Sequence, residues 1–274
     1  MVSLTYAQLE PIGICRYNCP ICLPRARKTN TRMSLKDIDL LIPQLREAGV
    51  RKVTLAGFGN PVEHPDYMEI VRKLAADFEV SVTCRVGDLD KVGPVHRANV
   101  SVCGMKDALG LIERVTSAMI YNLPLVSPHI VVTHDLAFGL NSMLHVLGSW
   151  ADHFERITLA PAIALCGDPR HRREIAKENK HTNSIWVAGV GDYPHSEKMQ
   201  LAGVHPRLSK CSWVKQGVYI NANLDVLPCC NLPCVTPFGN LGAKTLQEVR
   251  QGDAYRRFTE KKLPECAKCP DLGG

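Results

Sequence analysis

The sequence predicts an α/β protein in which about six consecutive βα units precede a small hairpin-and-helix region. Short runs rich in Val, Ile and Leu alternate with stretches of helical period as far as residue 163. Beyond that point the alternation is lost, and six of the twelve cysteines lie between Cys211 and Cys269. Six units are too few to close an eight-stranded barrel, so we expect a partial barrel, with a doubly wound sheet as the alternative. The predicted divisions are a core at 1–163, a polar excursion at 164–210 and a C-terminal region at 211–274.

The elements of the core follow from the hydrophobic period. The first strand is expected at 4–13 and the first helix at 34–49, with Ser34 as its N-cap and Gly49 as its end. Because the strands are mostly apolar throughout, we expect helices to cover both faces of the sheet. The other strands are expected at 52–59, 79–87, 99–105, 127–134 and 156–163. The other helices are expected at 66–78, 88–98, 106–122 and 140–154.

Composition indicates a soluble protein without a membrane segment. The 274 residues are 45% hydrophobic, enough for a sizeable core, and no apolar run approaches the length that spans a bilayer. The N-terminal residues lack the basic and apolar regions of a secretory signal, so we expect a cytoplasmic location. The net charge of +6 is mild, and the basic run at 25–32 has no interleaved aromatic residues, which gives no support to nucleic-acid binding.

The twelve cysteines indicate metal rather than disulfides in a reducing compartment, and their distribution predicts one metal site near each end of the chain. At the N-terminal end, Cys15, Cys19 and Cys22 follow the first predicted strand. Three thiolates suit a four-iron, four-sulfur cluster in which one iron lacks a protein ligand and can bind a reacting molecule. A zinc loop that takes a distant fourth ligand is the alternative.

These cysteines form a CxxxCxxC motif, and a second motif, GFGNPVEHPD, stands at 57–66. Together the two motifs resemble those of the radical S-adenosylmethionine (radical SAM) enzymes, whose second motif reads GxGEPxxHPD. The resemblance implies that the three cysteines hold a [4Fe–4S] cluster and that the backbone of the glycine turn receives the amino group of SAM. The residues of that turn are Gly57, Phe58, Gly59 and Asn60.

The chain departs from the family pattern at two positions. Asn60 stands where the family usually has Glu, and Ile21 stands where it usually has an aromatic residue. An Asn side chain still accepts a hydrogen bond through its carbonyl oxygen, so we expect SAM binding to persist. The missing aromatic residue is expected to loosen packing near the adenine, and neither change removes a metal ligand.

The resemblance also implies the chemistry. SAM binds the open iron, and one electron from the reduced cluster cleaves its sulfonium to methionine and a 5′-deoxyadenosyl radical, which takes a hydrogen atom from the substrate. The cofactor performs the difficult step, while the protein orients it and excludes water. We expect a small-molecule substrate and an electron donor such as flavodoxin or ferredoxin.

The C-terminal region resembles the auxiliary-cluster domain called SPASM, or its shorter form, Twitch. The matching segments are GVYINANLDVLPCCN, GN at 239–240, TLQEV and LPECAKCPDL. The first segment predicts a hairpin that turns near Asn223 to Asp225, and 245–262 is expected to be a helix. Because the chain ends five residues after Cys269, we expect the Twitch form with one auxiliary [4Fe–4S] cluster. The implied ligands are Cys211, Cys229, Cys266 and Cys269.

Two further cysteines in this region are surplus to that ligand set. Strand alternation is expected to send Cys230 to the face opposite Cys229. Cys234 could replace one of the four ligands. A structural zinc knuckle is the alternative for the whole region.

In size and layout the chain resembles the Twitch-type inosamine dehydrogenase of butirosin biosynthesis. By that analogy the reaction is two-electron oxidation of an alcohol in secondary metabolism, such as antibiotic biosynthesis, with one electron passing to the auxiliary cluster. The alternatives are crosslinking or epimerisation of a ribosomal peptide, rearrangement or epimerisation of a sugar or nucleoside, and a zinc-binding interaction module that is no enzyme. Few residues precede the first strand, so a leader-peptide-binding domain is not expected there, which argues against a peptide substrate.

Residues at the carboxyl ends of the predicted strands are candidates for the site. Arg85 could hold the carboxylate of SAM or of a substrate, or lie on the surface. His134 could act as a general base or be structural. Cys103 could donate a hydrogen atom or be a buried free thiol. Cys84 alternates away from Arg85 and is expected in the core.

Overall fold

One open sheet organises the protein. The computed structural model describes residues 3–17, 30–117, 124–132, 134–161, 199–201, 213, 216–230, 235–261 and 263. Within these residues, ten strands form one sheet in the order β10-β9-β8-β1-β2-β3-β4-β5-β6-β7. Its edges do not meet, which confirms the predicted partial barrel. The parallel strands of the core are β1 Tyr6–Leu9, β2 Lys52–Leu55, β3 Glu79–Arg85, β4 Arg97–Val102, β5 Leu125–Val132, β6 Ile157–Pro161 and β7 Met199–Leu201.

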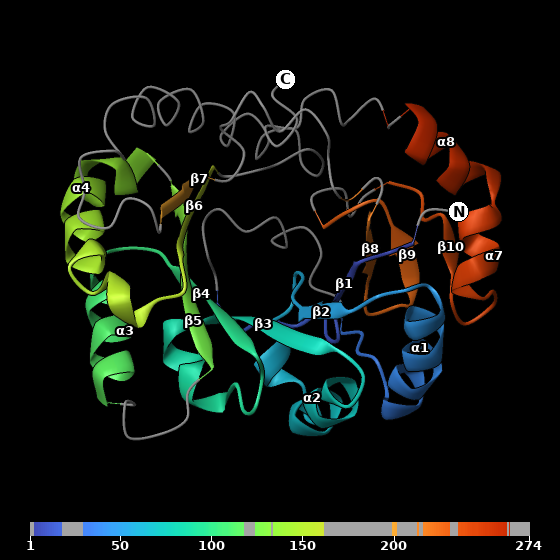
Figure 1. The fold of residues 1–274 in the computed structure, drawn as a ribbon, viewed down its shortest axis with the longest axis horizontal. Helices are drawn as coiled ribbons and strands as arrows, with labels where there is room; N and C mark the ends of the chain where they lie inside the picture. Colours follow the sequence, from blue (N-terminus) through green and yellow to red (C-terminus); the bar gives the residue numbers. More distant parts are fainter. Residues whose placement is uncertain are drawn as a thin grey trace.

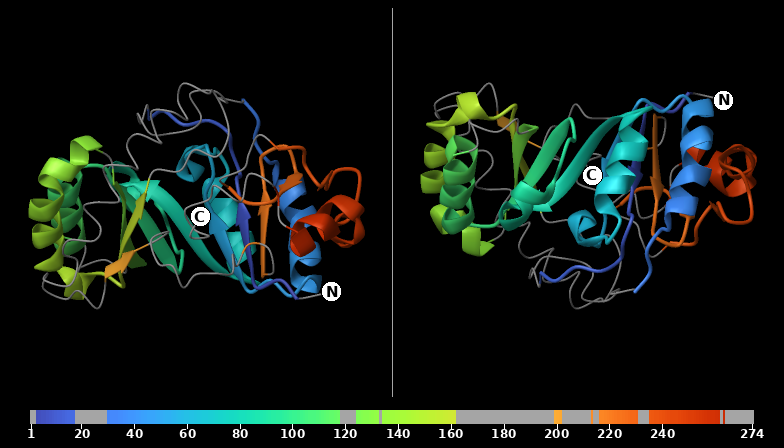
Figure 2. Two further views of the ribbon diagram at one scale, coloured as in Figure 1. Left: turned by 90° about the horizontal axis from the view of Figure 1, so that it is seen from above. Right: turned by 90° about the horizontal axis from the view of Figure 1, so that it is seen from below.

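The core helices lie outside the curved sheet, along one of its faces (Figure 1, Figure 2). In Figure 1 they form an arc from α1 at the right, through α2 at the bottom, to α3 and α4 at the left. The other face of the sheet is therefore the inner face of the partial barrel. The helices are α1 Leu35–Glu47, α2 Tyr67–Ala75, α3 Met105–Ser117 and α4 His134–Gly148, with short 3-10 helices η2 Pro61–Glu63, η3 Val86–Lys91 and η5 Ala151–His153.

Helix α1 shows how the local sequence sets an element's bounds. The Ser34 hydroxyl accepts a hydrogen bond from the Asp37 N–H at 3.2 Å, and the Asp37 carboxylate accepts from the Ser34 N–H at 2.7 Å. This reciprocal pair satisfies two N–H groups that would otherwise lack partners at the helix start. Gly49 follows the helix with φ of +90°, a conformation that suits glycine. Both predicted ends of this helix are confirmed.

The strands alternate between a buried apolar face and a more exposed polar face. Strand β4 has half-buried residues at Arg97, Asn99 and Ser101, and buried residues at the positions between them. The buried set on β1 to β6, which includes Val53 and Val100, belongs to the core beneath the helices. Within the described part of the chain, helices therefore cover one face of the sheet, in contrast to the prediction that they cover both. In β1, β2, β4 and β6 the apolar residues occupy alternate positions.

The C-terminal hairpin extends the sheet of the core. Strand β8 (Gly217–Ile220) pairs with β1 in parallel, and β9 (Asp225–Leu227) and β10 (Gly239–Asn240) continue antiparallel from it. The predicted hairpin is thus confirmed. The expected helix over 245–262 is divided at Gly252 into α7 (Leu246–Gln251) and α8 (Asp253–Lys261). Helix α7 contacts α1 through the Leu246 N–H, which donates to the Gln44 side-chain oxygen at 2.7 Å.

The segments at 88–98 and 164–210 complete the comparison with the predicted elements. The helix expected over 88–98 is wrong, because η3 ends at Lys91 and β4 already begins at Arg97. The excursion at 164–210 lies outside the described residues except for β7, which adds a seventh parallel strand beside β6. In the part of the chain that the structure describes, no helix combines the length and the apolar character needed to cross a bilayer.

The junction between core and hairpin generates a stability prediction. The Tyr219 hydroxyl donates to the buried carboxylate of Glu10, which also accepts from the Phe58 N–H at 2.9 Å. Tyr219→Phe removes a donor to a carboxylate and should lower the free energy of unfolding by about 2 kcal/mol. Tyr67→Phe is the matched control, because its buried hydroxyl donates to the neutral Val92 carbonyl at 2.9 Å and should cost about 1 kcal/mol. Urea unfolding measures both, and equal losses would contradict the special role of Tyr219.

Candidate functional site

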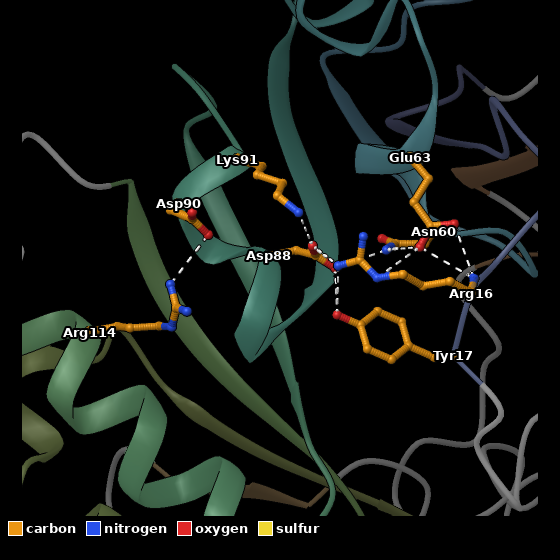
Figure 3. Close-up of polar contacts among 8 residues, drawn as sticks. All are labelled: Arg16, Tyr17, Asn60, Glu63, Asp88, Asp90, Lys91 and Arg114. Atoms are coloured by element: carbon orange, nitrogen blue, oxygen red, sulfur yellow. Dashed lines mark hydrogen bonds and ion pairs between the residues drawn. The ribbon is translucent and has the colours of Figure 1, made fainter.

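The carboxyl ends of β1, β2 and β3 bring three chain segments together. They are the segment after β1 that ends at Tyr17, the glycine turn at 57–60 after β2, and the start of η3 after β3. Figure 3 shows their polar side chains converging on Asp88. This is the edge of the sheet at which parallel α/β proteins place their ligands.

The glycine turn packs directly on the chain that leads into Cys15. A Cβ at Gly59 would lie 1.8 Å from the Ile12 carbonyl oxygen and 2.9 Å from that of Ile14. The Asn60 N–H donates to the Ile14 carbonyl at 2.8 Å. Gly59 is therefore required by a close contact between two protein segments. The space that a side chain at Gly59 would need is filled by the backbone of Ile12 and Ile14.

The same motif also holds the chain where it returns from the cysteine loop, residues 15–30. A ring nitrogen of His64, Nε2, lies 2.8 Å from the Met33 carbonyl oxygen, and both residues are buried. The two ends of the loop are joined to each other as well. The Gly13 N–H donates to Thr31 at 2.9 Å, and the Met33 N–H donates to Pro11 at 2.8 Å. The segment GFGNPVEHPD thus fixes both ends of the loop that carries the three cysteines.

Asp88 is the centre of the polar contacts, and its side chain is fully buried. The Tyr17 hydroxyl donates to its Oδ2 at 2.9 Å, and Asn60 Nδ2 donates to the same oxygen at 3.0 Å. The Arg16 guanidinium and the Lys91 ammonium both donate to Oδ1, the latter at 2.9 Å. Burial by itself would raise the pKa of Asp88, but these hydrogen bonds outweigh it and lower the pKa to about 2. Asp88 is a carboxylate throughout the physiological range.

Glu63 completes this network from η2. Its carboxylate accepts from Asn60 Nδ2 at 3.0 Å and from the Arg16 N–H at 3.1 Å. Both hydrogens of the Asn60 amide are therefore directed at carboxylates, and Oδ1 is the atom left to accept from a ligand. Asn60 stands where the family usually has Glu, and its amide donates a hydrogen bond to the Asp88 carboxylate. A Glu at this position would instead be repelled by that carboxylate.

Arg85 lies beside this network and is already engaged by neighbouring residues. One of its guanidinium nitrogens donates to Asp107 at 3.0 Å, and another contacts the Cys103 sulfur. The guanidinium also stands 5.3 Å from the centre of the Tyr17 ring, within the range of a cation–π contact. Its side chain is 21% exposed, so Arg85 is neither a surface arginine nor an isolated cation.

The other predicted residues divide by position. Cys103 is exposed at the end of β4, so the alternative of a buried thiol is wrong, whereas Cys84 is buried as predicted. Burial raises the pKa of Cys84 to about 12. His134 is the first residue of α4 and not the end of a strand, because β5 stops at Val132; its side chain lies outside the described part.

Only part of the predicted metal ligands can be placed. Cys15 is half-buried next to the glycine turn, and burial raises the pKa of its thiol, opposed by a hydrogen bond from the Tyr17 backbone. Cys229 and Cys230 are both half-buried and follow the end of β9, so strand alternation does not separate them as expected. The described residues contain no group of three potential metal ligands. The predicted ligands Cys19, Cys22, Cys211, Cys266 and Cys269, and the alternative Cys234, lie outside the described residues.

A pocket of about 190 Å³ lies between the core and the hairpin. Its polar lining includes Glu10, Tyr219, Asn221 and Asp225, with Phe58 among the apolar residues. Sequence reasoning missed this pocket, because β8 had not been expected to lie beside β1. It also missed Asp88, although an acidic residue shortly after a buried strand is a recognisable signal.

Gly59 generates the first prediction for the site. Gly59→Ala places a methyl carbon much closer to two backbone carbonyl oxygens than van der Waals radii allow. These carbonyls cannot move away without shifting the start of the cysteine loop. The free energy of unfolding should fall by roughly 3 kcal/mol. Gly104→Ala is the matched control, because nothing lies within 4 Å of its added Cβ. Similar urea midpoints for the two variants would contradict the packing described.

Asp88 generates the second prediction. Its pKa of about 2 lies below the ordinary 3.8, so its stabilising effect is complete above that ordinary value and is lost as the pH falls towards 2. Asp88→Asn should lower the free energy of unfolding by roughly 2 kcal/mol near neutral pH, with the difference from wild type vanishing in acid. Asp90→Asn is the control, since its side chain is 64% exposed and pairs only with Arg114 in Figure 3. A pH-independent loss in the Asp88 variant would contradict the role of its charge.

Comparison with known proteins agrees with these features. Residues 211–270 match the SPASM family, an iron–sulfur cluster-binding domain. A search of curated proteins finds no match. Among solved structures, Streptococcus suis SuiB bound to precursor peptide SuiA has a TM-score of 0.68 at 14% identity, over 99% of this chain and 71% of SuiB. Native anSMEcpe with bound AdoMet and Kp18Cys peptide has a TM-score of 0.63 at 14% identity, over 97% of this chain and 86% of that one.

BtrN in complex with AdoMet and 2-DOIA covers 99% of this chain and 93% of its own, at 13% identity, but its TM-score of 0.49 is too low to bear on function. The other two matches are radical SAM enzymes with SPASM-type domains. The resemblance seen in the two motifs and in the C-terminal cysteines is therefore confirmed: the chain has the fold of radical SAM enzymes and carries a SPASM iron–sulfur cluster-binding domain.

Proposed function

We propose that the protein is a radical SAM enzyme with one auxiliary iron–sulfur cluster that removes a hydrogen atom from a small-molecule substrate. The observation that carries this proposal is the contact between the two motifs, in which Gly59 and Asn60 pack on the residues just before Cys15. When bound, the first cluster and SAM together supply a 5′-deoxyadenosyl radical that takes a hydrogen atom from an unreactive C–H bond. The protein's own residues hold and orient these groups.

The atoms around the glycine turn fit the amino-acid end of SAM. Among the described residues, no hydrogen bond ends on the carbonyl oxygens of Gly57, Phe58 or Gly59. An amino group needs such acceptors, and Asn60 Oδ1 adds one more. The Phe58 N–H is already donated to Glu10, so carbonyl oxygens are the groups that this turn can offer. We propose Arg85, which is fixed by Asp107, as the cation that holds the carboxylate.

The cluster ligands follow from the two cysteine groups. We propose Cys15, Cys19 and Cys22 for the first cluster. Cys15 supports this assignment because it is half-buried directly beside the glycine turn. For the auxiliary cluster the proposed ligands are Cys211, Cys229, Cys266 and Cys269, all within the segment that matches the SPASM family. An external one-electron donor such as flavodoxin or ferredoxin would reduce the first cluster.

The favoured reaction is two-electron oxidation of an alcohol, with the auxiliary cluster as the acceptor of one electron. The iron–sulfur domain supports it, because loss of a hydrogen atom and a proton leaves one electron that needs an acceptor. His134 and Cys103 remain candidates for proton and hydrogen-atom transfer. Modification of a peptide is the second candidate, because SuiB and anSMEcpe, two similar folds, were each solved with a peptide bound.

Anaerobic reconstitution tests the proposal. The wild-type protein should be brown, hold about eight irons as two four-iron clusters, and release 5′-deoxyadenosine from SAM under dithionite. Cys15→Ala should lose about four irons and all release of 5′-deoxyadenosine, because the first cluster then lacks a ligand. Cys84→Ala is the matched control, since this thiol is buried in the hydrophobic core and belongs to neither proposed ligand set, so the variant should keep both properties.

Colourless protein that binds zinc would contradict the proposal and favour an interaction module. Release of 5′-deoxyadenosine by Cys15→Ala would contradict the assignment of the first cluster. Mass spectrometry of substrates separates the reactions, because oxidation removes two hydrogens, whereas epimerisation leaves the mass unchanged and takes deuterium from solvent.

A further inference from the structure

One row of polar residues crosses four neighbouring strands, β3 to β6, on the inner face of the sheet. The register pairs Arg85 with Ser101, Ser101 with His129, and His129 with Thr158. Paired residues of parallel strands project from the same face. Beyond Thr158, the register continues to position 200 on β7. Apolar residues occupy the alternate positions and belong to the core beneath the helices. Of the rows of paired residues that cross all these strands on the inner face, this one lies nearest to the carboxyl ends of the strands. It is therefore next to the edge of the sheet that carries the glycine turn.

The inner face is accessible at the row. On β5, Ser127 is 2% exposed, whereas His129, two residues further towards the carboxyl end, is half-buried. On β4, Ser101 is half-buried, and Cys103, which follows the end of the strand, is exposed. A ligand can therefore reach the row from the carboxyl ends of these strands. A substrate that enters from the open edge meets this row as the floor of its site.

His129 stands at the centre of the row in a state suited to accept a hydrogen bond. Among the described residues, neither of its ring nitrogens has a hydrogen-bond partner. Burial lowers the pKa of His129, and the nearby positive charge of Arg156 lowers it further. The imidazole is therefore neutral near pH 7 and keeps one nitrogen lone pair as an acceptor. Ion pairs among the described residues of this face include Arg97 with Glu155 below the row and Arg85 with Asp107 at its end.

We propose that Ser101, His129 and Thr158 form the floor of the substrate site and that His129 accepts a hydrogen bond from a substrate hydroxyl group. This inference rests on the proposed function and names the substrate class and a residue for it. His129 replaces His134 as the histidine that faces the substrate. Its acceptance of the hydroxyl hydrogen also places a base next to the proton that oxidation of an alcohol must release.

The row selects a neutral, hydroxylated small molecule. Neighbouring strands lie about 4.8 Å apart, so Ser101 and Thr158 stand about 10 Å apart with His129 midway. That span fits one hydroxylated ring, with a hydroxyl on either side of His129 to donate or accept. The positive charge of Arg156 disfavours a substrate ammonium group at this position.

Binding without turnover tests this inference independently of the radical chemistry. Isothermal titration of myo-inositol and D-glucose into the reconstituted full-length protein with SAM, and without reductant, should detect binding of at least one probe. His129→Phe keeps a ring but removes the acceptor, and it should weaken that affinity about tenfold, the value of one hydrogen bond of about 1.4 kcal/mol. The double substitution Ser101→Ala with Thr158→Ala should weaken it at least as much. His145→Phe is the matched control, because this histidine is exposed on α4 and the variant should bind as wild type does.

The pH dependence supplies a second readout. Because burial and the charge of Arg156 hold the pKa of His129 below its ordinary value, affinity should fall as the pH drops through that lowered pKa, at a lower pH than for an ordinary histidine. The inference is overturned if neither probe binds, if His129→Phe binds as wild type does, or if His134→Phe alone loses affinity. Binding of the tripeptide Ala-Ser-Ala with no binding of the two ring compounds would overturn the small-molecule class. Absence of 5′-deoxyadenosine with intact probe binding would instead refute the proposed function.

Discussion

The close contact between the glycine turn and the chain before Cys15 is the constraint on which the site depends. Gly59 has no room for a side chain, and Asn60 binds the Ile14 carbonyl from its backbone. At the other end of the cysteine loop, His64 contacts the Met33 carbonyl. The loop that carries the three proposed cluster ligands is thus fixed at both ends by the motif that we propose for SAM. Two distant sequence motifs form one site because backbone meets backbone, with no side chain between them.

The buried charge of Asp88 is the second constraint on how the segments at this edge of the sheet pack. Asp88 is surrounded by four donors from three segments, which stabilises the carboxylate and fixes the groups that donate to it. Burial of the Asp88 carboxylate without those donors would cost free energy. We therefore expect the three segments to pack together cooperatively. The network also orients Asn60, whose amide hydrogens are both taken by carboxylates. The departure from the family motif and the acidic residue after β3 are therefore two parts of one arrangement.

Much of this could be read from the sequence, because its signals are local. Helical period and the capping pair of Ser34 and Asp37 determine α1, and the turn residues near Asn223 determine the hairpin. The cysteine spacing and the GFGNPVEHPD motif were sufficient to predict the resemblance to radical SAM enzymes. Metal ligation and close backbone packing each require particular residues at particular spacings. The order of the βα units and the openness of the barrel followed from counting them.

What remained depended on contacts between residues far apart in the chain. Only the folded sheet places Tyr219 on Glu10, since that contact joins residues 209 positions apart. Only the strand register shows that His129 shares a row with Ser101, whereas His134 begins a helix. Local pattern by itself predicted most of the elements and the iron–sulfur domain at 211–270. The tertiary structure decided which polar groups meet, because pairing across strands has no counterpart in sequence distance.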